Sequence, residues 1–210
     1  MTAILLLVST ALAWEGQPGL WLPGATSLGA KTGRAGLGVA WGQNGGESLY
    51  GQGIVGATSR LAINVDGALQ EGGGGLGLGL RYRALVKDGF ALAPYAQFEF
   101  ASAGTSTYLG LAGAFAGDGA TLDASLTLFA AQTYDGHGTV VAPPDALGWF
   151  EAGLTFYPAK QQELRLGVLG QQDLNLAVTY RWRGSWWYVE PSLLWWPEDL
   201  SAQLGAGVRF

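Results

Sequence analysis

Hydrophobic and polar residues alternate one by one along most of the chain after about residue 34. In the segment 174–183, LNLAVTYRWR, every second residue from Leu174 to Trp182 is large and apolar, and the residues between them are polar or small. A period of two is typical of a β-strand with two different faces. The same pattern occurs in the segments 76–83, 90–100, 121–128 and 200–210. The sequence therefore predicts an all-β protein.

Alternating segments of about ten residues, separated by turn-forming residues, predict about twelve strands. We place them at 34–42, 48–55, 57–68, 75–86, 90–101, 107–116, 120–131, 147–157, 163–170, 174–183, 186–196 and 200–210. The even-numbered strands are followed by short turns, at Gly56, 87–89, 117–119, 158–162 and 184–185, whereas a long connection, 133–146, lies at the opposite end. Membrane barrels of bacteria have short periplasmic turns and longer extracellular loops. Both ends of this strand set are therefore predicted to be periplasmic.

The composition decides between a soluble sheet and a membrane sheet. Hydrophobic residues make up 49% of the 210 residues and charged residues 13%, well below the ~25% charge usual for soluble domains. Apart from a short N-terminal stretch, no apolar run approaches the ~20 residues that a spanning helix needs. Strands can span a bilayer only as a closed barrel, because a sheet edge in hydrocarbon leaves backbone groups unpaired. We therefore predict a closed antiparallel up-and-down transmembrane β-barrel in a bacterial outer membrane, with a polar lumen and an apolar exterior.

The N-terminal residues indicate export. The apolar run Ile4–Val8 and the small residues of 11–13 fit a signal peptide at 1–13, although no Lys or Arg precedes the run. The alternative is a buried first strand. Residues 14–33 are predicted to form a periplasmic or plug segment, and residues 34–210 the transmembrane barrel.

Aromatic residues on the apolar face concentrate at the ends of the predicted strands. Two such belts, at the two membrane interfaces, are expected around a membrane barrel. The predicted girdle comprises Tyr82, Phe90, Phe115, Phe156, Tyr180, Trp182 and Trp187 beside the periplasmic turns, and Trp195 at the opposite end. The competing structure, a soluble lipocalin-like barrel with its faces reversed, would scatter its aromatics along the strands.

The final strand, with apolar residues at every second position from Leu200 to Phe210, resembles the assembly signal of bacterial outer-membrane proteins. This resemblance implies insertion by the outer-membrane assembly machinery, with Phe210 as the terminal residue of the signal. The stretch 74–83, GGLGLGLRYR, is similar to the central hairpin of the phenol-degradation meta-pathway outer-membrane family. The similarity implies a passive channel for small molecules.

Charged residues gather on the polar face of the strands, where a wet lumen would tolerate them. The residues predicted to line the lumen are Arg60, Arg81, Arg83, Glu99, Asp123, Glu151, Arg165, Arg181, Arg183, Glu190 and Arg209, and Asp66 and Glu163 share this face. They form either a selectivity wall for a diffusing solute or a ladder of cross-strand ion pairs that stiffens or plugs the barrel.

Arg181 and Arg183 are the strongest candidates for a selectivity element. A two-residue turn at 184–185 pairs them with Tyr188 and Trp186, so no carboxylate is expected directly opposite. With Arg209 they would form a basic collar at the periplasmic mouth, and such a collar predicts mild anion preference. The inward glycines at 36, 38, 75, 77, 79, 205 and 207 either widen the lumen or accommodate strand curvature or large side chains.

Enzymatic and cofactor functions find little support in the sequence. The chain lacks cysteine, and its single histidine, His137, lies in the long connection beside Asp135. These two residues are too few for a metal site, and no strand supplies a histidine for a catalytic serine. The net charge of −5 argues against nucleic acid as a partner. Two hypotheses remain: a porin-like passive channel for small solutes, and a structural or adhesive barrel with a plugged lumen. Neither needs catalytic residues, a cofactor or a metal.

Overall fold

The computed structural model describes residues 33–42, 47–70, 73–101, 104–134, 140–141, 150–170, 174–196 and 199–210. The predicted signal peptide and all but the last residue of the predicted plug segment lie outside this part of the chain. The described strands are β1 (Gly33–Gly42), β2 (Glu47–Gly56), β3 (Leu61–Gln70), β4 (Gly73–Tyr82), β5 (Leu85–Lys87), β6 (Phe90–Ala101), β7 (Gly104–Ala116), β8 (Ala120–Tyr134), β9 (Val140–Val141), β10 (Phe150–Ala159), β11 (Gln162–Gly170), β12 (Leu174–Arg183), β13 (Trp187–Trp196) and β14 (Asp199–Arg209).

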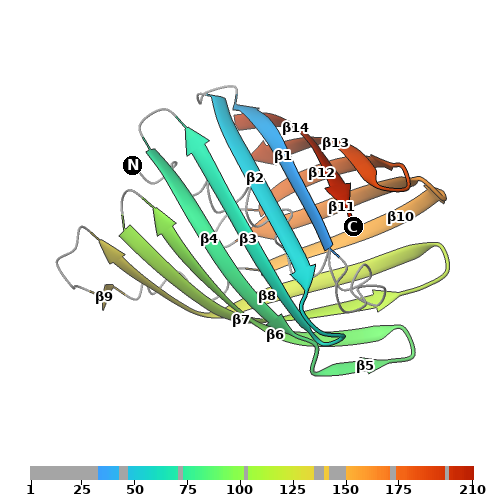
Figure 1. Ribbon diagram of the computed structural model, residues 1–210, viewed down its shortest axis with the longest axis horizontal. Coiled ribbons are helices and arrows are strands. Elements are labelled where there is room, and N and C mark those ends of the chain that lie inside the picture. Colours follow the sequence, from blue (N-terminus) through green and yellow to red (C-terminus); the bar gives the residue numbers. More distant parts are fainter. Residues whose placement is uncertain are drawn as a thin grey trace.

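Twelve of these strands close into an antiparallel barrel (Figure 1). Each long strand pairs with the next along the chain, β14 pairs with β1, and β8 pairs with β10. The short strand β5 adds to the start of β6, and β9 adds to the far end of β8. The predicted closed up-and-down barrel of about twelve strands is confirmed.

The two ends of the described chain meet at the seam between β1 and β14. The N–H of Gly33 donates to the carbonyl of Phe210 at 2.8 Å, and the N–H of Phe210 donates to the carbonyl of Gly33 at 3.0 Å. The Phe210 ring lies over Gly33, 2.9 Å from the position that a Cβ would take there. Glycine at residue 33 therefore lets the terminal ring cover the seam.

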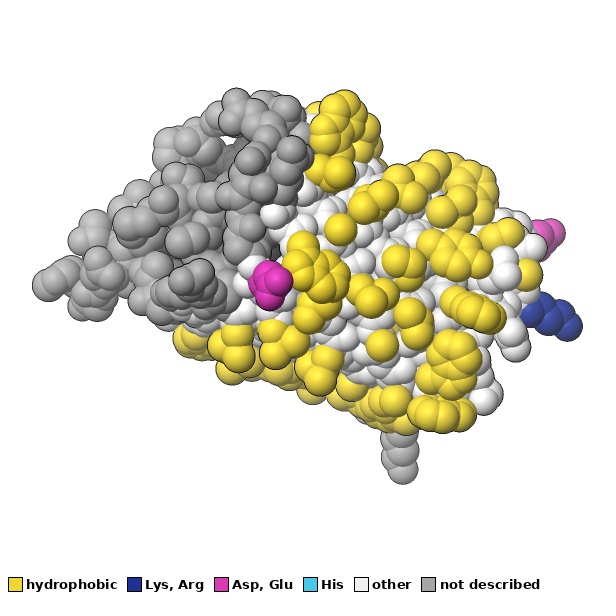
Figure 2. Space-filling view, turned by 90° about the horizontal axis from the view of Figure 1, so that it is seen from above, with side chains coloured by type: hydrophobic (Ala, Val, Ile, Leu, Met, Phe, Trp, Pro, Cys, Tyr) yellow, Lys and Arg dark blue, Asp and Glu magenta, His cyan; other side chains and the backbone are white. Residues whose placement is uncertain are grey.

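The exposure of β12 is the reverse of that in a soluble protein. Leu174, Leu176 and Val178 are 57%, 38% and 43% exposed, whereas Asn175 and Thr179 are only 5% and 4% exposed. Figure 2 shows hydrophobic side chains over the outer wall on the viewed face, with acidic and basic side chains only at the ends of its described part. The apolar exterior is confirmed, and the soluble barrel with reversed faces is excluded.

No helix among the described residues is long and apolar enough to cross a membrane.

Turns differ from the prediction where side chains cap the backbone. Residues 57–60 form a turn and not the start of a strand, because the Thr58 hydroxyl accepts hydrogen bonds from the N–H groups of Arg60 (3.1 Å) and Leu61 (2.9 Å). The predicted strand 75–86 ends at Tyr82, and 85–87 forms the separate β5. The turn between β5 and β6 has positive φ at Asp88 (48°) and Gly89 (81°), as a tight hairpin turn requires.

The turn between β12 and β13 is shifted by one residue from the predicted position. The N–H of Gly184 donates to the carbonyl of Trp187 at 2.8 Å, so the two-residue loop is Ser185–Trp186. The residue opposite Arg183 is therefore Tyr188, where Trp186 was predicted. A shift of one residue in the turn moves every pairing of the hairpin by two residues and leaves the two faces unchanged.

A charge on the outer wall should destabilise the barrel according to its depth in the membrane. Val178→Arg, in the middle of β12, is expected to lower the free energy of unfolding by about 2–4 kcal/mol, and Leu85→Arg, in the hairpin beyond β4, by about 0–1 kcal/mol. Urea unfolding in lipid vesicles measures both. Equal losses for the two variants would mean that the outer wall is not embedded in hydrocarbon.

Candidate lumen of the barrel

Polar side chains fill the inward face of the described strands. The buried polar and charged residues are Asn64, Asp66, Arg81, Glu99, Thr121, Asp123, Thr155, Arg165, Asn175, Thr179, Arg181, Glu190, Ser192, Ser201 and Gln203. Neighbouring strands bind one another through them, as where the Thr179 hydroxyl donates to Ser192 at 3.0 Å. Six of the predicted lumen residues are among them: Arg81, Glu99, Asp123, Arg165, Arg181 and Glu190. Whether they line a conducting path stays a prediction.

The predicted uncompensated collar of arginines is wrong. Arg181 binds Glu163 on β11 at 3.1 Å and forms a second ion pair with Glu190 on β13. Arg183 binds the other carboxylate oxygen of Glu163 at 2.6 Å. The Arg181 guanidinium also lies 5.4 Å from the centre of the Tyr188 ring, within the range of a cation–π contact. The shifted turn brings Glu190 into reach of Arg181, so the expected anion preference loses its basis.

A further ion pair crosses the adjoining part of the wall, between β8 and β11. Arg165 on β11 binds Asp123 on β8, and both side chains are nearly fully buried. Between these strands lies β10, where Gly153 is the register partner of Asp123. The guanidinium of Arg165 occupies the space that a side chain at Gly153 would take. Glycine on the central strand therefore permits an ion pair between strands that are not neighbours.

Three predicted lumen residues lie at the rim and not on the buried wall. Arg60 is exposed in the 57–60 turn and Arg209 is exposed at the end of β14. Arg83 follows β4, and its side chain donates to the carbonyl of Ser59. Partial burial and the neighbouring Arg60 lower the pKa of Arg83 below the usual value of an arginine. The remaining predicted residue, Glu151, lies on β10, and its side chain is outside the described part of the structure.

The inward glycines receive side chains from neighbouring strands. Tyr50 on β2 lies over Gly38, and its hydroxyl comes to 2.9 Å from the Cβ position of Gly205. Tyr188 on β13 lies over Gly207, where the Cβ position is 2.6 Å from its ring, and reaches Gly36. Each ring thus extends along the wall across two strands. Of the two interpretations of these glycines, room for large side chains is the one observed at these four positions.

The residues of the predicted aromatic girdle all occupy outward positions of their strands. Tyr82, Phe90, Phe115, Phe156, Trp182 and Trp195 are 37–57% exposed. Tyr180 and Trp187 are half-buried. The ring of Trp187 meets that of Trp182 edge to face, with centroids 6.1 Å apart. Their interaction with the membrane interface stays a prediction.

Sequence reasoning passed over several interior residues. It singled out charges, and therefore missed the tyrosines at 50 and 188 that cover the inward glycines, and the amides Asn64 and Gln52. It also left out one charged residue, Arg34 on β1. Strand parity would have found them, because each occupies an inward position of a strand whose neighbours point outward.

No group of three or more His, Cys, Asp or Glu side chains that could hold a metal ion occurs among the described residues. The predicted loop residues Asp135 and His137 lie outside the described part of the chain.

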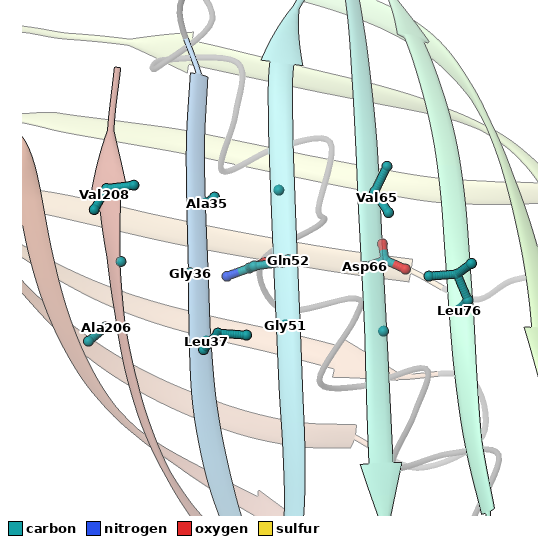
Figure 3. A pocket seen from close by; sticks show the side chains of 13 residues that line it. Ala35, Gly36, Leu37, Gly51, Gln52, Val65, Asp66, Leu76, Ala206 and Val208 are labelled. Carbon is teal, nitrogen blue, oxygen red and sulfur yellow. The ribbon is translucent and has the colours of Figure 1, made fainter.

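A shallow depression of about 600 Å³ lies on the outer wall over β14 and β1–β4 (Figure 3). Small residues on β2 and β3 create it, namely Gly51, Gly53 and Gly67, and exposed Leu37 and Val65 border it. Because it lies on the apolar outer wall, this depression is outside the barrel and does not lead through it. The candidate path for a solute is therefore the interior.

No protein-family model matches the chain, and a search of curated proteins finds no relative. Solved structures, however, share its fold. The KdgM porin superposes with a TM-score of 0.70 at 9% identity, covering 84% of this chain and 99% of that porin. The NanC porin superposes with a TM-score of 0.67 at 8% identity, covering 84% and 100%. An outer membrane channel from Pseudomonas putida F1 gives 0.55 at 12% identity, covering 87% and 97%.

The fold is thus that of bacterial outer-membrane β-barrel porins, and with its apolar exterior it places the protein in a bacterial outer membrane. KdgM has also been solved in complex with disordered oligogalacturonate. The comparisons do not show the phenol-degradation meta-pathway family, and that resemblance stays a prediction.

The buried pair of Arg165 and Asp123 should be strongly coupled. Asp123→Ala or Arg165→Ala alone is expected to lower the free energy of unfolding by about 3–5 kcal/mol, because each leaves an unpaired buried charge. The loss of unfolding free energy in the double variant should be smaller than the sum of the two single losses, by about 0.5–3 kcal/mol. Urea unfolding in vesicles measures the cycle, with the exposed Asp118→Ala as the control. Additive losses would mean that the two side chains do not interact.

Proposed function

We propose that the barrel is a passive channel for small solutes across the outer membrane. The observation that carries this proposal is the arrangement of the large inward side chains. Tyr50 and Tyr188 lie along the wall over glycines of neighbouring strands and do not project toward the axis. Side chains stacked against the wall in this way leave the axis of a twelve-stranded barrel free for a narrow lumen.

The fold supports the same function. Twelve strands lie between filled eight-stranded barrels and the sixteen-stranded porins with wide aqueous channels. The structures with the same fold described above include two porins and an outer membrane channel. An oligosaccharide acid of the kind that KdgM binds is one solute to test. Catalysis has no part in this proposal.

The described charges of the interior are balanced. The described inward side chains include five arginines, Arg34, Arg81, Arg165, Arg181 and Arg183, and five carboxylates, Asp66, Glu99, Asp123, Glu163 and Glu190. A wall with equal numbers of both signs favours weak selectivity between small anions and cations.

A structural barrel with a plugged lumen is the second candidate. Its supporting observation is burial, since Glu190 and Leu194 on β13 are each only 1% exposed. Side chains this well covered fit a lumen filled by other parts of the chain, including the predicted plug segment 14–33. In that case the outer surface or the loops would carry the function.

Conductance separates the two candidates. The wild-type barrel in planar bilayers should pass a small current with weak ion selectivity. Glu163→Gln removes the carboxylate shared by Arg181 and Arg183, so the reversal potential in a salt gradient should shift toward anion preference by severalfold in permeability ratio. The exposed Glu47→Gln, the same change at the opposite rim, should leave it unchanged. Inserted barrels without current would favour the plugged structure.

Phe210 serves to test the proposed insertion by the assembly machinery. Deleting it removes the two main-chain hydrogen bonds to Gly33, but eleven residues of β14 remain. Refolding into vesicles should therefore persist, whereas insertion in cells should fall severalfold, as seen in fractionated outer membranes. Normal insertion of the truncated chain in cells would show that the final strand is no such signal.

A further inference from the structure

Two buried carboxylates meet over a glycine on the β3–β4–β6 wall. Asp66 on β3 is the register partner of Gly77 on β4, and Gly77 is in turn the partner of Glu99 on β6. Asp66 and Glu99 are only 3% and 8% exposed. Oδ1 of Asp66 occupies the space that a side chain at Gly77 would take. The carboxylate of Asp66 therefore extends across β4 toward Glu99.

Figure 3 shows the direction of this side chain. The carboxylate of Asp66 turns toward β4, whereas Gln52, its register partner on β2, turns the opposite way, toward Gly36 on β1. The amide of Gln52 therefore does not satisfy the carboxylate. Oδ1 of Asp66 is buried and has no hydrogen-bond partner in the part of the chain that the structure describes.

Two amide side chains face each other across β4 in the same way as the two carboxylates, at the next inward position of the same strands. Asn64 on β3 and Gln97 on β6 are both register partners of Gly79 on β4. The Nδ2 of Asn64 donates to Asp66 at 3.2 Å, and the Nε2 of Gln97 donates to Glu99 at 3.2 Å. Each amide has turned its nitrogen toward an acid, so its carbonyl oxygen remains available as an acceptor or ligand.

These two acids differ from the other described carboxylates of the interior. Asp123, Glu163 and Glu190 each bind an arginine. Among the described residues, no ion pair involves Asp66 or Glu99. Burying two neighbouring carboxylates without a counter-charge is costly, and two solutions exist: a shared proton or a bound cation.

We propose that Asp66 and Glu99 bind a hydrated calcium ion on the inner wall of the barrel. Hard cations take oxygen ligands, and Ca²⁺ accepts six to eight of them, in a flexible geometry that includes amide carbonyls and water. The two carboxylates supply the charge, the carbonyl oxygens of Asn64 and Gln97 add neutral ligands, and water completes the shell. Glycines at 77 and 79 supply the space, since no β4 side chain covers the four groups. The Tyr108 hydroxyl, hydrogen-bonded to Glu99, orients that carboxylate.

Calcium binding is a property of the folded wall and does not depend on conduction. A barrel that passes no current would still bind the ion, and a conducting barrel without the ion would leave the channel proposal intact. The two proposals therefore fail separately.

Calorimetric titration of the refolded full-length barrel with CaCl₂, in zwitterionic detergent, tests the site. One ion per barrel is expected, with a dissociation constant of about 10⁻⁴–10⁻³ M, as for sites with few charged ligands. The variant Asp66→Asn/Glu99→Gln should lose at least about tenfold in affinity, because it removes the charge and keeps the shape. Glu47→Gln/Asp118→Asn makes the same two changes at exposed positions and should bind as the wild type does.

A second variant leaves the charges in place. The Cβ of Gly77→Ala would overlap Oδ1 of Asp66, so the carboxylate must move and affinity should fall to the same extent. The matched control is Gly53→Ala on β2, whose Cβ would meet only ordinary contacts at 3.8 and 4.0 Å. If the double acid variant does not refold, the comparison of Gly77→Ala with Gly53→Ala still tests the calcium site.

Three results would overturn the proposal. The first is a folded wild-type barrel that takes up no calcium at millimolar concentration. The second is a folded acid variant, or a folded Gly77→Ala variant, with wild-type affinity. The third is a wild-type barrel whose urea midpoint of unfolding is unchanged by calcium but rises when the pH is lowered. That behaviour would identify a proton shared by the two carboxylates.

Discussion

Every strand of this barrel exists because a backbone group in hydrocarbon needs a partner. The pairing of β14 with β1, completed by the two hydrogen bonds between Gly33 and Phe210, removes the last free edge. Once the ladder is closed, side chains alternate between two faces whose solvents differ. Leucine and valine become the exposed residues of β12, and asparagine and threonine the buried ones. The apolar exterior and the polar interior are thus consequences of one closed ladder.

The interior then has to satisfy its own polar groups, and glycine makes this possible. A glycine on a middle strand lets a long side chain lie along the wall and reach a partner two strands away. Arg165 reaches Asp123 over Gly153 in this way, and Tyr188 lies over Gly207 toward Gly36. The 35 glycines of the chain weaken individual strands, but the inward ones let the wall carry large polar side chains without filling the axis.

Alternation predicted the faces well because it depends only on parity. The inward positions of Arg181 and Glu190 follow from their neighbours Trp182 and Val189, wherever the turn lies. Their ion pair could not be predicted, because it depends on the register of the hairpin. The turn lies at Ser185–Trp186 and not at Gly184–Ser185, and that shift brings Glu190 opposite Arg181. The other carboxylate of the cluster, Glu163, is the register partner of Arg181 on β11 and does not depend on this turn. Local hydrogen bonding had a similar effect at Arg60, where Thr58 caps a turn that the alternation alone had assigned to a strand.

An inward glycine covered by a charged side chain from a neighbouring strand occurs on two parts of the wall, but the charges around it differ. On β10, the glycine at 153 lies beneath an arginine that meets an aspartate, and the charges cancel. On β4, the glycine at 77 lies beneath Asp66, which faces Glu99, and the charges add. Composition alone could not distinguish these cases, since both need an inward glycine flanked by inward polar residues. The difference lies in which neighbouring strand supplies the basic side chain. On β10 that strand is β11, whereas β3 and β6 supply only acids and amides beside Gly77 and Gly79, so neither neighbouring strand supplies a counter-charge there.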